Sequence, residues 1–489
     1  MTNTIDLSRR EFLRKGSMLS VAGSLSAPFA FNLFSMNVAA ATTLNTDYKA
    51  IVCLYLEGGN DSANMVLATD TPSWNGYLAA RSNGGAGIAL PIGSVLPIVP
   101  STTKVDDVGT RSFALHPSLI QIKSLFDVGR AAVVANVGTL LEPIADKVVY
   151  RSNSVQKPDN LFSHSDQTTQ WHSTDPDKPI YGWGGRMADA LKTSNSKQNF
   201  SSISSSGNSV FLAGETINQY QINANGVAVP IGGMNNLFGI NTTSNPMSGI
   251  ITNIGASNLI EREHAAVVER SIAAQTDLNN VMLATQTSVP LPTQYTNPNN
   301  NQLNNNQLAT QLRTVARVIA GQAALGAHRQ VFFVSIGGFD THDNQLTGQA
   351  DLFAKIGHAV NYFDTTLSSL AGLGDLRNNV TLFTASDFGR TFTSNGDGTD
   401  HGWGAHHFVV GGAVRGKEIY GDFPQTAVSG GSIDNPLDVG SGNWIPTVSV
   451  DQYAGTLAKW FGLSPSEIAS VFPNLTNFPI QDQDVGFML

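Results

Sequence analysis

The chain has 489 residues, 28 basic and 37 acidic side chains, and a formal net charge of −9. Because the basic residues are scattered, this composition excludes the concentrated positive surface that nucleic acids or anionic lipids require. The single cysteine, Cys53, excludes a disulfide within the chain and is compatible with an oxidising compartment.

The first 41 residues predict an export signal. Arg9 and Arg10 stand directly before Glu11, an aromatic residue and a leucine, which is the twin-arginine pattern. A weakly apolar stretch, residues 18–38, then leads to a small-residue cleavage site at 39–41. A membrane anchor is the alternative, but serine, glycine and proline dilute the stretch below a stable span. We therefore expect the twin-arginine (Tat) translocase as a partner during export, and a periplasmic or secreted protein with no stable membrane span after cleavage.

An α/β domain is expected from residue 42 to residue 489. Residues 51–56 are continuously apolar and rich in β-branched side chains, which predicts a strand buried on both faces. A helix carrying Ile122, Leu125 and Phe126 follows, and residues 131–137 predict a second buried strand. The succession of strand, helix and strand is typical of a mostly parallel sheet with helices on both faces.

Residues from about 196 to 306 have a different character, because they are rich in Ser, Asn and Gly and show little periodicity. A helix at about 259–283 is the most ordered part that we expect there. The Asn/Gln tract at 297–307 predicts a solvated linker. We interpret the whole region as an insertion or cap in one domain, not as a second domain.

The regular alternation of helices and strands returns after this region. A helical face at 308–319 precedes a strand at 331–336, and a helix at 352–370 precedes a strand at 380–384. An apolar run at 408–410 and a last helix near 453–461 complete the predicted core.

Acidic residues follow three of the predicted strands in turns that contain glycine. Because loops at the carboxyl ends of strands line the ligand crevice of open α/β sheets, these carboxylates are expected to converge. Histidines join them in two of the loops, and a mixture of carboxylate and imidazole suits Zn²⁺, Mn²⁺ or Mg²⁺. The expected metal ligands are Asp61, Asp340, His342, Asp387, Asp400 and His401.

Three of these residues have a structural alternative. Asp61 is placed to cap the following helix, and Asp387 is placed to pair with Arg390. Asp400 is placed to orient His401 without binding the metal itself. Spacing along the chain leaves these alternatives open, because convergence of the loops is an assumption.

Seven motifs follow one another in a fixed order along the chain. They are Gly58-Gly59-Asn60-Asp61, Ala114-Leu115-His116-Pro117, Ser163-His164 with Trp171, Gly182-Trp183-Gly184-Gly185-Arg186, Gly337-Gly338-Phe339-Asp340-Thr341-His342, Ser386-Asp387-Phe388-Gly389-Arg390 and Gly398-Thr399-Asp400-His401-Gly402. Together they resemble one known family, the Tat-exported bacterial family catalogued as domain of unknown function one-five-zero-one. The resemblance runs from about Tyr48 to the C-terminus.

That family is similar to a distant branch of the alkaline phosphatase, sulfatase and phosphoglycerate mutase superfamily. The resemblance implies a mixed, mostly parallel sheet with helices on both faces and a two-metal site at the strand ends. It implies that the first ligand is Asp61, or Glu57 as an alternative. The superfamily's later Asp and His pair resembles Asp340 and His342, and its final histidine resembles His401.

The resemblance is incomplete at two places. Phe388 follows Asp387 where the superfamily has a histidine, which puts a second metal ion in doubt. The nucleophile position falls near Asn160, so Ser163 is the candidate nucleophile, with His164 as metal ligand or general base. The alternative for Ser163 is that it caps the helix that begins there.

Two functions follow from these predictions. The first is an exported hydrolase of a phosphate or sulfate ester that depends on one or two divalent ions (Zn, Mn, Mg or Ca), with Arg186 or Arg390 binding the anionic group of a small ester substrate. The second is a catalytically degenerate member of the superfamily that binds a ligand or assists an exported assembly. Metal content separates the two.

Overall fold

The structure is a computed structural model. It describes residues 47–82, 87–152, 154–226, 236–237, 240–241, 258–370, 372–427 and 434–489. The predicted signal peptide, residues 1–41, lies outside the described residues. Asp47–Leu489 form one compact unit, which includes the described parts of the polar region at 196–306.

The core of this unit is a nine-stranded sheet in the order β19-β7-β18-β15-β1-β14-β8-β9, with β20 also paired to β7. Neighbouring strands run parallel except at β18, which is antiparallel to β15 and β7. The predicted mixed, mostly parallel sheet is therefore confirmed. The strands are β1 (Lys49–Glu57), β7 (Ala131–Gly138), β8 (Ser202–Ser204), β9 (Tyr220–Gln221), β14 (Arg329–Gly337), β15 (Val380–Ser386), β18 (Ala405–Val410), β19 (Ile419–Tyr420) and β20 (Val448–Ser449).

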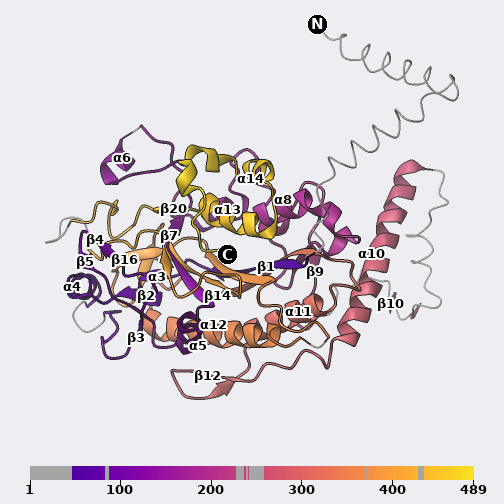
Figure 1. The fold of residues 1–489 in the computed structure, drawn as a ribbon, viewed down its shortest axis with the longest axis horizontal. Coiled ribbons are helices and arrows are strands. Elements are labelled where there is room, and N and C mark those ends of the chain that lie inside the picture. The colour runs from indigo at the N-terminus through magenta and orange to yellow at the C-terminus, as the bar shows by residue number, and fades with distance from the viewer. Residues whose placement is uncertain are drawn as a thin grey trace, which may run out of the picture. The chain divides into compact units, whose positions relative to one another are not determined.

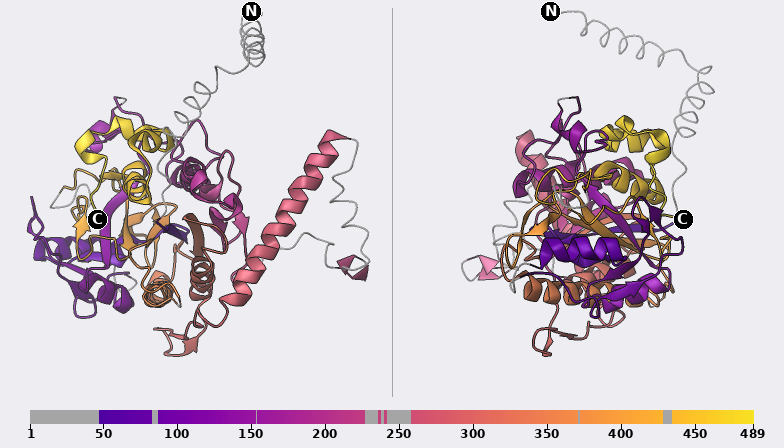
Figure 2. Two further views of the ribbon diagram at one scale, coloured as in Figure 1. Left: turned by 45° about the vertical axis from the view of Figure 1, so that its right-hand side comes forward. Right: turned by 90° about the vertical axis from the view of Figure 1, so that its left-hand side faces the viewer.

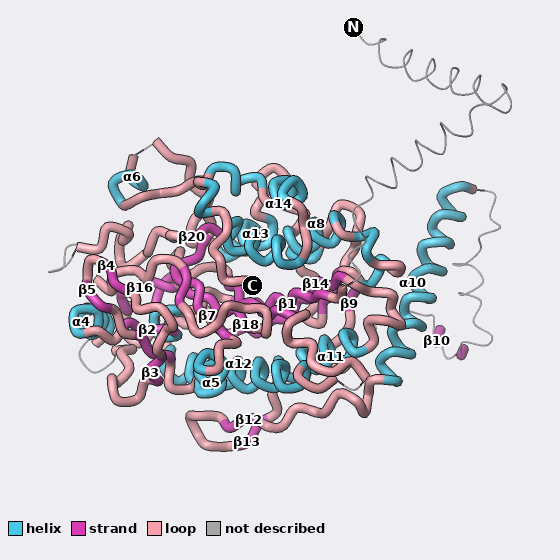
Figure 3. Tube along the Cα trace, in the orientation of Figure 1, coloured by secondary structure: helices cyan, strands magenta, loops and turns pink. Residues whose placement is uncertain are grey.

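Helices cover both faces of the sheet, as predicted (Figure 1). Alternate residues of β1 point to opposite sides: Val52 and Leu54 join one apolar cluster, whereas Ile51 and Cys53 join the other. The side of Val52 packs against α5 (Ile120–Asp127), α11 (Gln307–Ala320) and α12 (Gln345–Leu367). The side of Ile51 packs against α8 (Trp183–Ala190), α13 (Val450–Phe461) and α14 (Pro465–Val471). Figure 3 shows the strands between these two helical layers.

The strand order differs from the simplest expectation. The sequence predicts that residues 131–137 complete a strand, helix and strand unit with β1, but β15 and β18 lie between β7 and β1. The intervening strands come from the last third of the chain, so the local succession of elements did not contain this information.

The polar region contains more structure than a linker. α10 (Leu259–Ala284) packs through its C-terminal half, where Leu278 and Val281 are buried (Figure 2). The tract at 297–307 was predicted to be a solvated linker; instead it completes the hairpin of β12 (Tyr295–Thr296) and β13 (Leu303–Asn304) and begins α11. Asn306 caps α11, because its side chain accepts a hydrogen bond from the backbone of Leu308.

None of the described helices has the length and apolar character needed to cross a membrane. Smaller helices and strands surround the central sheet. They are β2 (Val66–Ala68), β3 (Leu96–Ile98), β6 (Phe113–Leu115), β4 (Val105–Asp106), β5 (Gly109–Thr110), β10 (Asn236–Leu237), β11 (Ile240–Asn241), β16 (Arg390–Ser394), β17 (Thr399–His401), α3 (Ser62–Met65), α4 (Thr71–Arg81), α6 (Lys147–Arg151) and α7 (His164–Ser173).

The register of the central strands places several loops at one edge of the sheet. Leu56 of β1 is paired with Ile336 of β14 and with Ser386 of β15, so the three strands end together. Because β18 runs the opposite way, the segment that precedes it, β17, returns to the same edge. The convergence of loops that the sequence argument assumed is therefore present.

Candidate metal centre

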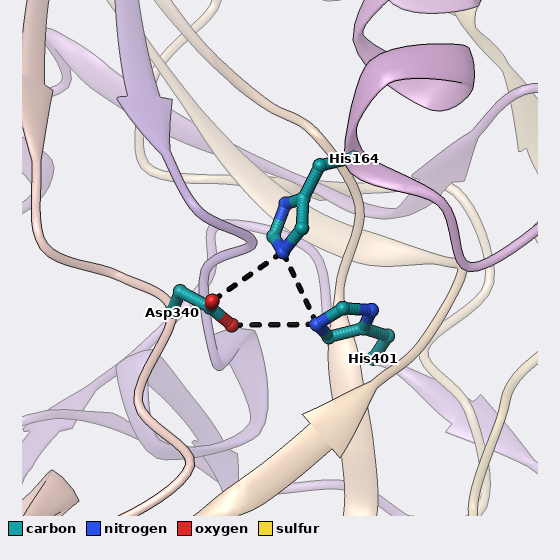
Figure 4. Close-up of side chains that lie close together, drawn as sticks. All are labelled: His164, Asp340 and His401. Carbon is teal, nitrogen blue, oxygen red and sulfur yellow. Dashed lines mark hydrogen bonds and ion pairs between the residues drawn. The ribbon is translucent and has the colours of Figure 1, made fainter.

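Three histidines and one aspartate converge at this edge of the sheet. Figure 4 draws three of these residues, His164, Asp340 and His401. His164 is the first residue of α7, His401 ends β17, and Asp340 and His342 lie in the loop after β14. The Nε2 atom of His401 lies 3.1 Å from Nε2 of His164 and 3.1 Å from Nε2 of His342. The Asp340 carboxylate lies 3.0 Å from His342, 3.4 Å from His401 and 3.5 Å from His164.

The other ring nitrogen of each imidazole, Nδ1, lies close to an oxygen atom of a neighbouring residue. Nδ1 of His164 lies 2.7 Å from an Asp387 oxygen, and Nδ1 of His401 lies 2.8 Å from the backbone carbonyl of Phe162. Nδ1 of His342 lies 3.3 Å from an Asp400 oxygen. Carboxylate and carbonyl oxygens accept hydrogen bonds, so the Nδ1 atoms of His164 and His401 carry the protons that they donate. His342 has a carboxylate oxygen near each nitrogen, and the nearer one, from Asp340, lies at Nε2.

A neutral imidazole has one N–H group, so the Nε2 atoms of His164 and His401 direct lone pairs at each other. Two such nitrogens beside a carboxylate repel each other unless a cation lies among them. In a tetrahedral zinc centre with bonds of about 2.0–2.1 Å, the ligand atoms are roughly 3.3 Å apart. The separations of 3.1–3.5 Å among His164, His401 and Asp340 match that spacing, so these three residues fit a divalent metal ion, with His342 beside two of them.

Arg390 fixes the position and the charge of Asp340. Its side chain is fully buried, and its NH1 atom lies 2.5 Å from Oδ1 of Asp340. Burial would raise the pKa of Asp340, but the hydrogen bond and the charge of Arg390 outweigh it and hold that pKa below its ordinary value. Burial lowers the pKa of His401, and the charge of Arg390 adds to the effect. Both shifts favour the deprotonated forms that bind metals.

The Phe388 ring packs against two imidazoles of the site, and Gly59 lies against that ring. The Phe388 ring is buried, with its centroid 4.8 Å from those of His164 and His401. Gly59 has φ +84°, and a Cβ atom there would lie 2.3 Å from the Phe388 ring. Glycine is required at this position because the loop after β1 passes directly over that ring.

The structure brings together four residues that the sequence named as site residues, namely His164, Asp340, His342 and His401. Asp387 and Asp400, predicted as ligands, lie on the Nδ1 side of His164 and His342 instead. Such carboxylates orient metal-binding histidines rather than bind the metal. The alternative of an orienting role for Asp400 was foreseen, but for His401 rather than for His342.

Asp61, also predicted as a ligand, is placed elsewhere. Both of its oxygens are bound by Arg81, at 2.6 and 2.8 Å, and both side chains are fully buried. Gln345 donates a further hydrogen bond of 2.6 Å, and Asp61 caps α3 by accepting from the backbone of Ala63. The capping alternative is thus observed. The reason is a buried arginine from α4, which the motif around Asp61 does not reveal.

Ser163 and Arg390, which the sequence predicted to be catalytic, also have contacts that differ from the expectation. The Ser163 hydroxyl donates to Asp166 at 2.5 Å, and none of its described hydrogen bonds reaches the histidines. Arg390 was expected to bind the anionic group of a substrate. Instead its donors go to Asp340, to Thr399 and to the carbonyl of Gly58.

Sequence reasoning missed Gln345 and the carbonyl of Phe162. Gln345 bridges Asp61 to Thr399, whose hydroxyl lies 2.6 Å from Oε1 of Gln345. The hydroxyl of Thr399 in turn lies 3.3 Å from Nε of Arg390. A glutamine at the start of a helix carries no sequence signal for such a role, and a backbone carbonyl carries none at all.

The sequence matches, over residues 48–439, a family described as "Protein of unknown function (DUF1501)". The chain belongs to this family. The family resemblance predicted from the seven motifs is therefore confirmed, and the matched range of DUF1501 includes all four residues of the cluster. A comparison with curated protein sequences gives no match.

Several solved structures share a distant likeness with this DUF1501 member. One is Ps i-CgsB in complex with k-i-k-neocarrahexaose, with 8% identity, 90% of this chain and 78% of the other covered, and a TM-score of 0.35. A Bacteroides thetaiotaomicron structure from work on glycosaminoglycan metabolism, labelled 4S-sulf, has 11% identity, coverages of 87% and 75%, and a TM-score of 0.35.

The soluble domain of lipooligosaccharide phosphoethanolamine transferase A from Neisseria meningitidis has 8% identity, coverages of 91% and 94%, and a TM-score of 0.33. Likeness at this level carries no inference about activity, so we base the functional proposal on the site itself.

Proposed function

We propose that the protein is an exported hydrolase of phosphate or sulfate esters that depends on a divalent metal ion. The observation that carries the proposal is the convergence of three Nε2 atoms on the Asp340 carboxylate, with every Nδ1 held by an acceptor. Three imidazoles favour Zn²⁺ over Mg²⁺ or Ca²⁺, which prefer oxygen ligands. One ion is proposed, because Asp387 faces His164 and leaves no second carboxylate in the described cluster.

A bound zinc ion would polarise an ester oxygen and lower the pKa of a bound water. The chain's own part is to hold the ligands in place: Asp387 orients His164, the Phe162 carbonyl orients His401 and Arg390 fixes Asp340. His342 and Asp340 are 46% and 45% exposed, so the cluster is accessible from solvent. An accessible centre of this kind suits catalysis better than a purely structural role. Export is supported by the twin-arginine pattern at Arg9 and Arg10.

Metal analysis of the purified protein tests the proposal. We expect about one equivalent of zinc by mass spectrometry, and loss of that metal in His401→Ala. The matched control is His264→Ala, an exposed histidine of α10 that should leave the metal content unchanged. Turnover of aryl phosphate or aryl sulfate should disappear in Asp340→Ala. A metal-free protein whose turnover is unaltered by Asp340→Ala would contradict the proposal.

A second function is favoured by two specific observations. The Ser163 hydroxyl is engaged by Asp166, and Phe388 occupies the position where the superfamily has a histidine. Both suit a degenerate member that binds a ligand or assists an exported assembly without turnover. In that case the purified protein should lack stoichiometric metal, and it should hydrolyse neither ester.

A further inference from the structure

A cavity of about 250 Å³ lies beside the cluster, on the other side of α7. Thr139 directly follows β7, and Asp451 follows β20, a parallel neighbour of β7. β7 runs in the same direction as β15, because each is antiparallel to β18. The cavity therefore opens at the same edge of the sheet as the histidine cluster. One face of α7, with Asp166, Thr169 and Gln170, forms its wall.

The cavity is strongly acidic. Four aspartates line it, and none of the described lining residues is basic; the four are Asp159, Asp166, Asp175 and Asp451. Asp175 is paired with Arg186 at 2.9 Å, which leaves a negative excess. Such a cavity repels phosphate, sulfate and carboxylate groups and attracts a cation.

Three polar atoms in the wall have no hydrogen-bond partner among the described residues. They are Oγ1 of Thr139, Oε1 of Gln170 and Oδ1 of Asp451. Asp451 is 2% exposed, and burial raises its pKa to about 8 against the opposing charge of Arg186. Its carboxyl group is therefore mainly protonated at neutral pH, and a cation bound next to it would favour the carboxylate form. Buried acceptors are nearly always paired in folded proteins. Unpaired acceptors on one cavity wall indicate that a hydrogen-bond donor belongs there.

The residues that line the cavity limit the kinds of cation that it can bind. No three of the described carboxylates in the cavity approach closely enough to hold a metal ion, unlike His164, Asp340 and His401. None of the described residues that line the cavity is aromatic, although aromatic faces are what quaternary ammonium groups bind. Ser173, Thr174 and Asn474 add further polar groups, and the rest of the described wall is apolar, formed by Leu140, Leu141, Pro158, Pro176, Pro179 and Val450. The volume of about 250 Å³ is slightly below that of typical ligand pockets, which begin at about 300 Å³, so the cavity suits only a small ligand.

We propose that this cavity binds a protonated primary amine carried on a short aliphatic arm. An ammonium group offers three N–H donors to the carboxylate, amide and hydroxyl oxygens of the wall. The aliphatic arm lies along the proline and leucine side. Neither the family match nor the metal proposal assigns a ligand to this cavity.

Titration of propylammonium chloride into the purified full chain, followed by ligand-observed NMR, tests the proposal. We expect saturable binding, with propanol and tetramethylammonium chloride at least tenfold weaker at the same ionic strength. Asp451→Asn should weaken propylammonium binding at least tenfold. Because Asp451 is buried, Asp159→Lys provides a second test at an exposed position of the wall. Asp127→Asn, an exposed acidic residue of α5, is the matched control and should bind as the wild type does.

Equal binding of propanol and propylammonium, or unchanged binding in a folded Asp159→Lys variant, overturns the proposal. The titration is repeated with His401→Ala, which alters the cluster but not the cavity. Unchanged amine binding there supports the cavity as the site, whatever the outcome of the metal analysis. Loss of amine binding there overturns it, because the probe would then bind at the cluster.

The amine can be a free molecule or one arm of an ester; the second source rests on the proposed function. Competition with 3-aminopropyl phosphate separates the two. If this ester displaces propylammonium at least tenfold better than propylamine itself does, the amine belongs to an ester that reaches the cluster. Equal displacement identifies a free amine, and both results support the cavity.

Discussion

The loop after β1 and the loop after β14 have the same pattern, two glycines, one further residue and an aspartate, at the ends of adjacent parallel strands. Their aspartates nevertheless have opposite environments. Asp61 is fully buried and bound by Arg81, whereas Asp340 is 45% exposed and faces three histidines. The residues that meet each loop from distant segments therefore decide whether a strand-end aspartate stabilises the fold or is available to a metal.

The largest expected effect comes from breaking the buried ion pair between Arg81 and Asp61, in the loop after β1. Arg81→Ala leaves the Asp61 carboxylate buried without its partner, which should lower the free energy of unfolding by about 3–5 kcal/mol. Urea denaturation measures this change. Lys123→Ala is the control, because its pair with Asp127 is solvent-accessible and should contribute less than about 1 kcal/mol.

The second test replaces Asp340 and Asp61 in turn and compares the zinc affinity of the two variants. Asp340→Asn should weaken zinc binding by about 100-fold or more, because it removes the charged oxygen of the cluster. Asp61→Asn should keep about one equivalent of zinc. Competition with a chelator measures both affinities. If Asp61→Asn lost its metal while Asp340→Asn kept it, the assignment of the two loops would be reversed.

The orienting carboxylates should give smaller losses. Asp387→Asn replaces the charged acceptor of the part-buried 2.7 Å hydrogen bond to His164 with a neutral amide and should weaken zinc binding by about 10–100-fold. Asp400 is 62% exposed and 3.3 Å from His342, so Asp400→Asn should cost less than about tenfold. Equal effects in the same chelator competition would show that Asp400 does more than orient His342.

The smallest effect is a shift in the pH of metal release. The pKa of His401 is lowered by burial, and that of Asp340 is held down by Arg390 despite burial. A lowered pKa keeps the deprotonated, metal-binding form present in more acid solution. Zinc should therefore be retained as the pH falls past about 6.5, the ordinary value for histidine, and be released below it. Metal content after desalting at stepped pH measures the midpoint; release above that pH contradicts the prediction.

Much of the fold was predictable because it rests on local patterns. The apolar runs at 51–56, 331–336 and 380–384 lie within β1, β14 and β15, and the helix expected at 259–283 lies within α10. The position of β18 between β15 and β7 was not predictable, because strand order depends on pairing between distant segments. The hairpin in the Asn/Gln tract was missed because it is formed by two short strands without an apolar period.

For the site, the sequence determined which chemistry is present, because it supplied the side chains of His164, Asp340, His342 and His401. The tertiary structure decided which side chains share a centre. Asp61 and Asp387 carry the same group as Asp340, but Arg81 binds the first and His164 the second. The physical reason is that a carboxylate becomes a ligand, an ion-pair partner or an orienting group through the charges and donors around it, and those come from residues remote in the sequence.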